Sequence, residues 1–137
     1  MNISNDPDAQ RKLLLDSKVI AVVGYSPDAS RTSYQIAQYL KRAGYTVIPV
    51  NPTVEEIDGD KSYASLAHIP QPIDIVNVFR RAEHLPDVVT DAINAGAKAV
   101  WAQLGVVHPD AEKHADDGNT PLVMDVCIKV AHMQLGV

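Results

Sequence analysis

Five short, uninterrupted apolar segments recur along the chain, and stretches whose apolar residues have helical spacing separate them. An apolar run without alternation predicts a strand that is covered on both of its faces. Strands that are connected by helices pair in parallel through right-handed crossovers. The pattern therefore predicts an α/β chain with a doubly wound, five-stranded parallel sheet and helices on both faces. The expected strands are Lys18–Gly24, Thr46–Val50, Ile73–Phe79, Ala97–Trp101 and Pro121–Met124.

Helices are expected where apolar spacing coincides with residues that start or stop a helix. Asp6-Pro7-Asp8 opens a first helix that ends near Leu15, and Asp125 is placed to cap a last helix that runs to about Leu135. Asp58-Gly59 is a turn signal, and the segment 62–68 is expected to be a short helix at most. The remaining expected helices are Ser33–Ala43, Leu85–Ala95 and Pro109–Asp117.

The bulk properties favour a single domain over residues 1–137 and leave a small anionic ligand open. The chain has 12 basic and 17 acidic residues, a formal net charge of −5, which argues against nucleic-acid binding but not against a small anionic ligand. Its one cysteine, Cys127, forms no internal disulfide. The polar, acidic N-terminal segment does not resemble a signal peptide, and no apolar run approaches the roughly 20 residues of a membrane span. The expected location is the cytoplasm.

A doubly wound sheet binds its ligand beyond the carboxyl ends of its strands, near the point where the strand order reverses. The residues that follow each expected strand are therefore the candidate site residues. These are Gly24–Ser33, Asn51-Pro52, Phe79–Arg81, Gln103–Val106 and Asp125–Cys127.

The loop after the first expected strand has the composition of a phosphate site. Gly24 permits a sharp turn, and the hydroxyls of Ser26, Ser30 and Ser33 precede or begin a helix whose N-terminus attracts phosphate. Arg31 adds a guanidinium suited to phosphate oxygens. Under an alternative interpretation the serines only cap the helix and Arg31 is a solvated surface residue.

Two absences disfavour a dinucleotide such as NAD. The dinucleotide fingerprint requires G-x-G-x-x-G, and only Gly24 is present here. Such sites also carry an acidic residue about 20 residues further on for the ribose hydroxyl, whereas the second expected strand ends at Asn51. Asparagine does not repel a phosphorylated ribose, so both facts fit a nucleotide with phosphate on its ribose.

Four segments resemble the small stand-alone CoA-binding proteins, which are similar to the nucleotide-binding domain of the succinyl-CoA synthetase α subunit. The resemblance extends from about Leu14 to Leu135 and implies a Rossmann-like fold with coenzyme A as the ligand. The segments are Val22–Tyr34 (VVGYSPDASRTSY), Val47–Pro52 (VIPVNP), Asp74–Arg81 (DIVNVFRR) and Trp101–Val106 (WAQLGV).

The same resemblance assigns expected roles along the ligand. The diphosphate would lie on the loop that contains Tyr25, held by Gly24, Ser26, Ser30, Arg31 and Ser33. Asn51 and Pro52 would lie near the adenosine, while Phe79, Arg80 and Arg81 would flank the 3′-phosphate or the entry of the pantetheine arm. Gln103 and Gly105 would line that arm. Family members often carry a Glu-His pair where this chain has Ala131-His132.

Other chemistry-bearing residues have competing interpretations. Arg81 and its neighbour Arg80 either bind the ligand or pair on the surface with an acid such as Glu83. Trp101 either packs in the core or lines the pantetheine channel. Cys127 is either a small core residue or a thiol that forms a mixed disulfide with the coenzyme. Its spacing of five from His132 does not suit a metal site.

These observations favour a protein that binds coenzyme A or a short acyl-CoA without catalysis of its own. No acid–base pair or activated nucleophile is predicted, so no residue is assigned a catalytic role, and none a metal. One alternative is a component of an acyl-CoA ligase or transferase that works with a separate subunit. A NAD(P)-binding oxidoreductase is the other alternative, which the missing glycines disfavour.

Overall fold

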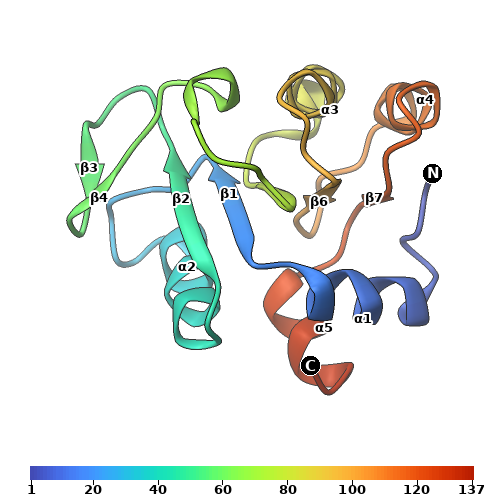
Figure 1. Cartoon of the computed structure of the whole chain (residues 1–137), viewed down its shortest axis with the longest axis horizontal. Helices are drawn as coiled ribbons and strands as arrows, with labels where there is room; N and C mark the ends of the chain where they lie inside the picture. Colours follow the sequence, from blue (N-terminus) through green and yellow to red (C-terminus); the bar gives the residue numbers. More distant parts are fainter.

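The computed structural model describes residues 1–137, and five parallel strands form its central sheet in the order β2-β1-β5-β6-β7 (Figure 1). Because β2 lies on one side of β1 and the later strands lie on the other, the order reverses between β1 and β5. The doubly wound Rossmann-like sheet is thereby confirmed. The strands are β1 (Val19–Val23), β2 (Thr46–Val50), β5 (Ile75–Val78), β6 (Ala99–Ala102) and β7 (Leu122–Val123).

Helices cover both faces of the sheet. One face carries α1 (Pro7–Asp16), α2 (Thr32–Arg42) and α5 (Ile128–Gln134), and the other carries α3 (Leu85–Asn94) and α4 (Pro109–Asp117) (Figure 1). Two short 3₁₀ turns, η1 (Leu66–His68) and η2 (Ala82–His84), precede β5 and α3. The helix expected at 62–68 is thus only the turn η1.

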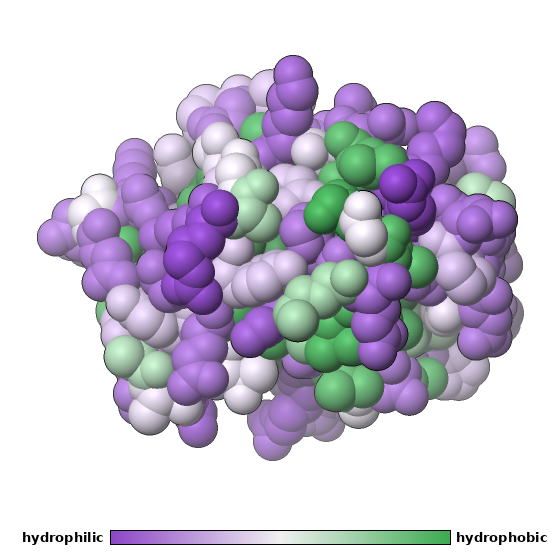
Figure 2. All heavy atoms as spheres, turned by 90° about the horizontal axis from the view of Figure 1, so that it is seen from below, coloured by the Kyte–Doolittle hydropathy of each residue, from purple (hydrophilic) through white to green (hydrophobic).

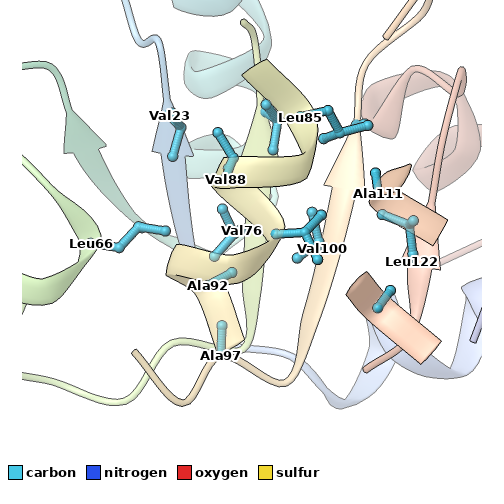
Figure 3. Close-up of a cluster of buried hydrophobic side chains, with 14 of the residues drawn as sticks. Val23, Leu66, Val76, Leu85, Val88, Ala92, Ala97, Val100, Ala111 and Leu122 are labelled. Atoms are coloured by element: carbon cyan, nitrogen blue, oxygen red, sulfur yellow. The ribbon is translucent and has the colours of Figure 1, made fainter. Parts of the chain in front are cut away.

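The core is divided by the sheet into two clusters, because successive strand residues point to opposite faces. On β5, Val76 packs against α3, as Figure 3 shows with Val88 and Ala92, whereas Ile75 packs on the opposite face. Both faces of each strand are therefore buried, which is the physical reason that the strands lack alternating polarity. Pro49 is accommodated because β2 is an edge strand.

A short hairpin follows β2 and is attached to α2. Its strands β3 (Glu56–Ile57) and β4 (Asp60–Lys61) are joined at Asp58-Gly59, where both φ angles are positive (52° and 84°). The Lys41 ammonium on α2 lies 2.7 Å from the Asp60 carboxylate, and the Tyr34 hydroxyl donates to Asp58 over 2.5 Å. The hairpin therefore closes over the same helix whose first turn adjoins the candidate phosphate loop.

The predicted cap of the last helix is wrong. α5 begins at Ile128, and Cys127 occupies the N-cap position without a side-chain capping bond. Asp125 instead has a positive φ of 60°, and its carboxylate accepts the amide of Gly105 over 2.7 Å. This carboxylate stabilises the loop after β6 because it faces that loop rather than the helix.

No helix has both the length and the apolar character that crossing a membrane requires. The face formed by α1, α2 and α5 mixes hydrophilic and hydrophobic surface (Figure 2). Its exposed large apolar side chains include Leu15 on α1 and Val130 and Met133 on α5.

Candidate functional site

A cleft of about 370 Å³ opens at the carboxyl ends of β1 and β2, on the α3 side of the sheet. It lies next to the reversal of strand order, where a doubly wound sheet places its ligand. Four of the predicted site residues line this cleft, namely Gly24, Asn51, Pro52 and Arg80. The other lining residues are Val23, Val50, Thr53, Ala64, Ser65, Leu66, Val88 and Asp91.

Gly24 occupies a position that only glycine fits. Its φ is +86°, and a Cβ atom built there would lie 2.5 Å from the carbonyl oxygen of Phe79. Its amide also donates to the carbonyl of Val50 over 3.1 Å. The end of β1 is thus held tightly between its two neighbours, and its backbone is open to a ligand because no side chain covers it.

The hydroxyls of the following loop bind within the loop itself. Ser33 Oγ accepts the amide of Ser26 over 3.0 Å, and Ser26 Oγ accepts the amide of Asp28 over 3.1 Å. The Ser30 amide and hydroxyl both donate to the Asp28 carboxylate, and these two bonds lower the pKa of Asp28. The serine side chains therefore form hydrogen bonds that hold the loop in its own conformation.

The first turn of α2 has no side-chain cap, so the interpretation that the serines cap this helix is wrong. Arg31 occupies the N-cap position, and neither it nor a neighbouring hydroxyl accepts from the first turn. The amides of Thr32, Ser33 and Tyr34 have no acceptor in the protein. Uncovered amides at a helix N-terminus favour an anion. None of these residues lines the α3-side cleft, but the loop connects them to Gly24.

Asn51 joins the end of β2 to the phosphate loop. Its Nδ2 donates to the carbonyl of Tyr25 over 2.9 Å, and its Oδ1 accepts the amide and hydroxyl of Thr53 over 2.9 and 2.7 Å. Tyr25 is fully buried, which raises the pKa of its phenol, and its hydroxyl accepts from Gln38 over 3.0 Å. The loop is therefore supported from β2 and from α2.

The two predicted arginines have different surroundings. Arg80 lines the cleft and has no carboxylate within ion-pair distance. Arg81 points away, is 82% exposed, and has its Nε 3.3 Å from a Glu83 carboxylate oxygen. For Arg81 the surface-pair interpretation therefore describes the structure, while Arg80 brings to the cleft a guanidinium that forms no ion pair.

Three other predicted residues, Phe79, Gln103 and Gly105, do not line the cleft. Phe79 packs against the core cluster on the α2 and α5 face. Gly105 has a φ of +79° and donates to Asp125. The side-chain oxygen Oε1 of Gln103 is buried without a hydrogen-bond partner. Phe79 therefore lies on the other face of the sheet from the cleft, and Gly105 is held by Asp125.

Trp101, Cys127 and His132 contribute to the core rather than to the cleft. Trp101 is fully buried, and its Nε1 donates to the carbonyl of Val126 over 3.0 Å. Cys127 is half-buried and free. His132 bonds Tyr39 through Nδ1 over 2.7 Å, and burial lowers its pKa. No group of three or more histidine, cysteine or acidic side chains is arranged to hold a metal ion.

Two kinds of residue escaped the sequence analysis. Ser65 and Asp91 reach the cleft from outside the strand ends, one preceding η1 and one on α3, and no local pattern marks them. Asn77 is fully buried in the middle of β5. A signal for Asn77 existed, since it is a polar residue inside an otherwise apolar strand.

The fold and the cleft define the class of the protein: an α/β protein with a Rossmann-like parallel sheet and a cleft at the point where its strand order reverses. Residues 18–133 match the family model described as CoA binding domain, and the chain belongs to this family. It is 46% identical over 122 residues to the Bacillus subtilis protein YneT, covering 89% of this chain and 90% of that one.

Two further relatives extend the comparison. A solved structure of a hypothetical protein from Pyrococcus horikoshii superposes with a TM-score of 0.93 at 35% identity, covering 100% of this chain and 97% of the other. An ADP-forming acetate–CoA ligase of Archaeoglobus fulgidus is 34% identical over 130 residues. That match covers 88% of this chain but only 19% of the ligase. The chain is therefore related both to small proteins of its own length and to one part of acyl-CoA ligases.

Proposed function

We propose that this protein binds coenzyme A or a short acyl-CoA at the carboxyl edge of its sheet, without catalysing a reaction of its own. The observation that carries the proposal is the unpaired Arg80 in the cleft beside Gly24, in a chain of the CoA-binding family. The cytoplasm, where coenzyme A is used, is the proposed place of action.

The residues present fit the chemistry of this ligand. Coenzyme A carries a diphosphate and a 3′-phosphate on its ribose. The uncovered amides of α2 and the Arg31 guanidinium suit the diphosphate, and Arg80 suits the 3′-phosphate. Gly24 leaves the backbone accessible between them because no Cβ fits there. The protein would thus supply separate sites for the two phosphate groups.

The part of the cleft formed by Asn51 and Pro52 would receive the adenosine. The Asn51 side chain is hydrogen-bonded to Tyr25 and Thr53, so we expect it to shape this wall of the cleft rather than to bind the ligand through its amide. Asp91 and Ser65 add polar groups to the opposite wall.

Isothermal titration calorimetry with coenzyme A, dephospho-CoA and NAD tests the proposal. We expect coenzyme A to bind more tightly than dephospho-CoA, which lacks the 3′-phosphate, and NAD to bind most weakly. If NAD binds as tightly as coenzyme A, the proposal is wrong and the dinucleotide alternative gains support. Equal affinities for coenzyme A and dephospho-CoA would contradict binding of the 3′-phosphate by Arg80, but coenzyme A would remain the proposed ligand.

A second candidate function is that of a CoA-binding component that works with separate ligase domains. The match to part of an acetate–CoA ligase favours it. Under this proposal the protein presents the thioester or thiol end of the coenzyme to a partner that supplies the catalytic residues. Co-purification of a tagged chain from its own cells, followed by an acyl-CoA ligase assay of the complex, tests this candidate. A chain that purifies alone with bound coenzyme A would favour the first proposal.

A further inference from the structure

The side chain of His132 on α5 is enclosed between two tyrosines from the region of α2. The residue is only 9% exposed, and its ring centroid lies 5.4 Å from that of Tyr39 and 5.8 Å from that of Tyr45, both in edge-to-face orientation. Its Nδ1 shares a 2.7 Å hydrogen bond with the Tyr39 hydroxyl. The imidazole therefore joins the last helix of the chain to α2.

The position of α5 depends on few buried side chains. The helix has seven residues, of which Ile128, Ala131 and His132 are buried. A helix this short is not stable by itself, so its packing against α1 and α2 holds it in place. Of the three buried side chains, only the imidazole can change its charge. The protonation state of His132 therefore bears directly on the docking of α5.

Several cations surround the His132 ring. Lys129, one turn earlier on α5, places its ammonium 5.4 Å from the centroid of the Tyr39 ring. Lys18, directly before β1, lines the same pocket of about 400 Å³ as His132. Arg11 approaches from α1, where its Nε donates to the carbonyl of Leu135 over 3.0 Å. A proton added to the imidazole would thus join an environment that is already positive.

No acidic group balances this charge. No carboxylate lies within ion-pair distance of the His132 ring. Asp16, at the end of α1, is exposed and pairs with Lys12 over 2.9 Å. The Tyr45 phenol donates to the carbonyl of Leu14 over 2.6 Å, and burial raises its pKa, so it supplies no negative charge. Burial of an unpaired charge is unfavourable, in keeping with a His132 pKa that burial lowers.

We propose that His132 is a pH-sensitive switch, and that protonation of its ring releases α5 from α2. The neutral ring fits between the two tyrosines, whereas the charged ring is better solvated in water, so acid shifts the helix toward an undocked state. The contribution of the neutral ring is fully present above the ordinary histidine pKa of 6.5 and is lost as the pH falls through the lowered value.

Release of α5 would affect the segment that precedes it at the carboxyl edge of the sheet. Cys127 is the half-buried N-cap residue of α5, and the carbonyl of Val126 accepts the indole N–H of Trp101 over 3.0 Å. The chain has one cysteine and one tryptophan, so each side chain reports on this segment without interference. Undocking should expose the thiol and weaken the indole hydrogen bond. The switch goes beyond the proposed function and does not require coenzyme A.

The reaction of Cys127 with dipyridyl disulfide, measured from about pH 7.5 to about pH 5, tests the proposal. Each rate is divided by the rate for a short cysteine peptide at the same pH, which removes the pH dependence of the thiol chemistry itself. We expect the corrected rate of the wild type to rise about tenfold or more in acid, as for a local opening that is linked to protonation. The emission of Trp101 should shift to the red over the same range.

Two variants remove the titrating group. His132→Gln keeps a hydrogen-bonding group for Tyr39, and His132→Phe keeps an aromatic ring between the tyrosines. In either variant that folds, the corrected rate should not depend on pH. His68→Gln is the matched control, because His68 is exposed and lies on η1, and it should retain the response of the wild type.

A wild-type rate that does not rise in acid, or a rise that persists in His132→Gln, would overturn the proposal. So would a rise that accompanies loss of the whole far-ultraviolet circular dichroism signal, because that indicates global unfolding. If neither variant folds, a chain in which every other histidine is replaced by glutamine decides, since loss of the response there would equally contradict the role of His132. All measurements are made without coenzyme A, so a failure here is distinct from a failure of the proposed function.

Discussion

The carbonyl oxygen of Phe79, the residue directly after β5, lies so close to Gly24 that a Cβ atom at position 24 would be 2.5 Å from it. The contact joins the ends of β1 and β5, the two strands between which the sheet order reverses. At this switch point the two backbones are in close contact, which brings the candidate phosphate loop near the segment after β5 that carries Arg80.

Gly24→Ala should destabilise the protein by about 2 kcal/mol or more, because left-handed strain and a clash with backbone act together. Urea unfolding measures the loss. Gly96→Ala is the matched control, since Gly96 also has a positive φ (+76°) but nothing lies within 4 Å of its added Cβ. If both variants lose the same free energy of unfolding, the close contact with Phe79 does not contribute to the effect of Gly24→Ala.

Arg80→Gln should weaken coenzyme A binding roughly 10-fold or more, the effect expected for one charge-assisted hydrogen bond to phosphate. The affinity for dephospho-CoA should barely change, because that ligand lacks the 3′-phosphate. Arg81→Gln is the control, since Arg81 is 82% exposed and pairs with Glu83. The prediction is contradicted if Arg80→Gln weakens both ligands alike, or if Arg81→Gln has the larger effect.

Asn51→Asp should loosen the phosphate loop. The substitution replaces the Nδ2 donor with a carboxylate oxygen that faces the Tyr25 carbonyl, so a 2.9 Å hydrogen bond becomes a repulsion. We expect a loss of roughly 1–3 kcal/mol of unfolding free energy, as for a broken hydrogen bond between partly buried groups. Thermal and urea unfolding check it, with Asn5→Asp as an exposed control that makes no side-chain hydrogen bond. A stability unchanged from the wild type would show that the Asn51 amide does not support the loop.

Asp74, at the amino end of the sheet, should make the free energy of unfolding depend on pH. Burial tends to raise the pKa of its carboxyl, but bonds from the amides of Lys18 and Val19 and from the Lys98 ammonium outweigh burial, and the pKa is lowered. The carboxylate therefore contributes stability that is fully present above its ordinary value of 3.8 and is lost as the pH falls through the lowered value.

Asp74→Asn should accordingly cost roughly 1–3 kcal/mol at neutral pH, and its difference from the wild type should narrow in acid. Urea midpoints measured across an acid series check the sign. A difference that stays constant as the pH falls would mean that the charge of Asp74 is not what stabilises the start of β1.

The strands were predictable because each is buried on both faces and is therefore apolar throughout. The expected strand Thr46–Val50 is β2 residue for residue, and the turn signal Asp58-Gly59 joins the hairpin β3–β4. The Asp125 cap failed for a different reason. Local sequence shows that an aspartate precedes a helix. It does not show that the amide of Gly105, 20 residues earlier in the chain, donates to the Asp125 carboxylate.

In the candidate site, too, some residues could be predicted from the local sequence and others could not. Gly24 and Arg80 were predicted from their places after strands, and both line the cleft. The neighbouring Arg81 could not be distinguished from Arg80, since only the direction of each side chain sends one into the cleft and the other to Glu83. Asp91 lines the cleft from α3 because this helix packs on the sheet, and no local sequence pattern predicts that packing.

By itself the sequence determined the order of strands and helices and the resemblance to CoA-binding proteins, and it predicted a phosphate site in the loop after β1. Those features depend on local periodicity and on short motifs. The tertiary structure alone decided which strand ends share a cleft, which hydroxyls are consumed within the loop, and that His132 lies between Tyr39 and Tyr45. These features depend on contacts between residues far apart in the chain, and the geometry of those contacts is set only when the strands pair and the helices pack on the sheet.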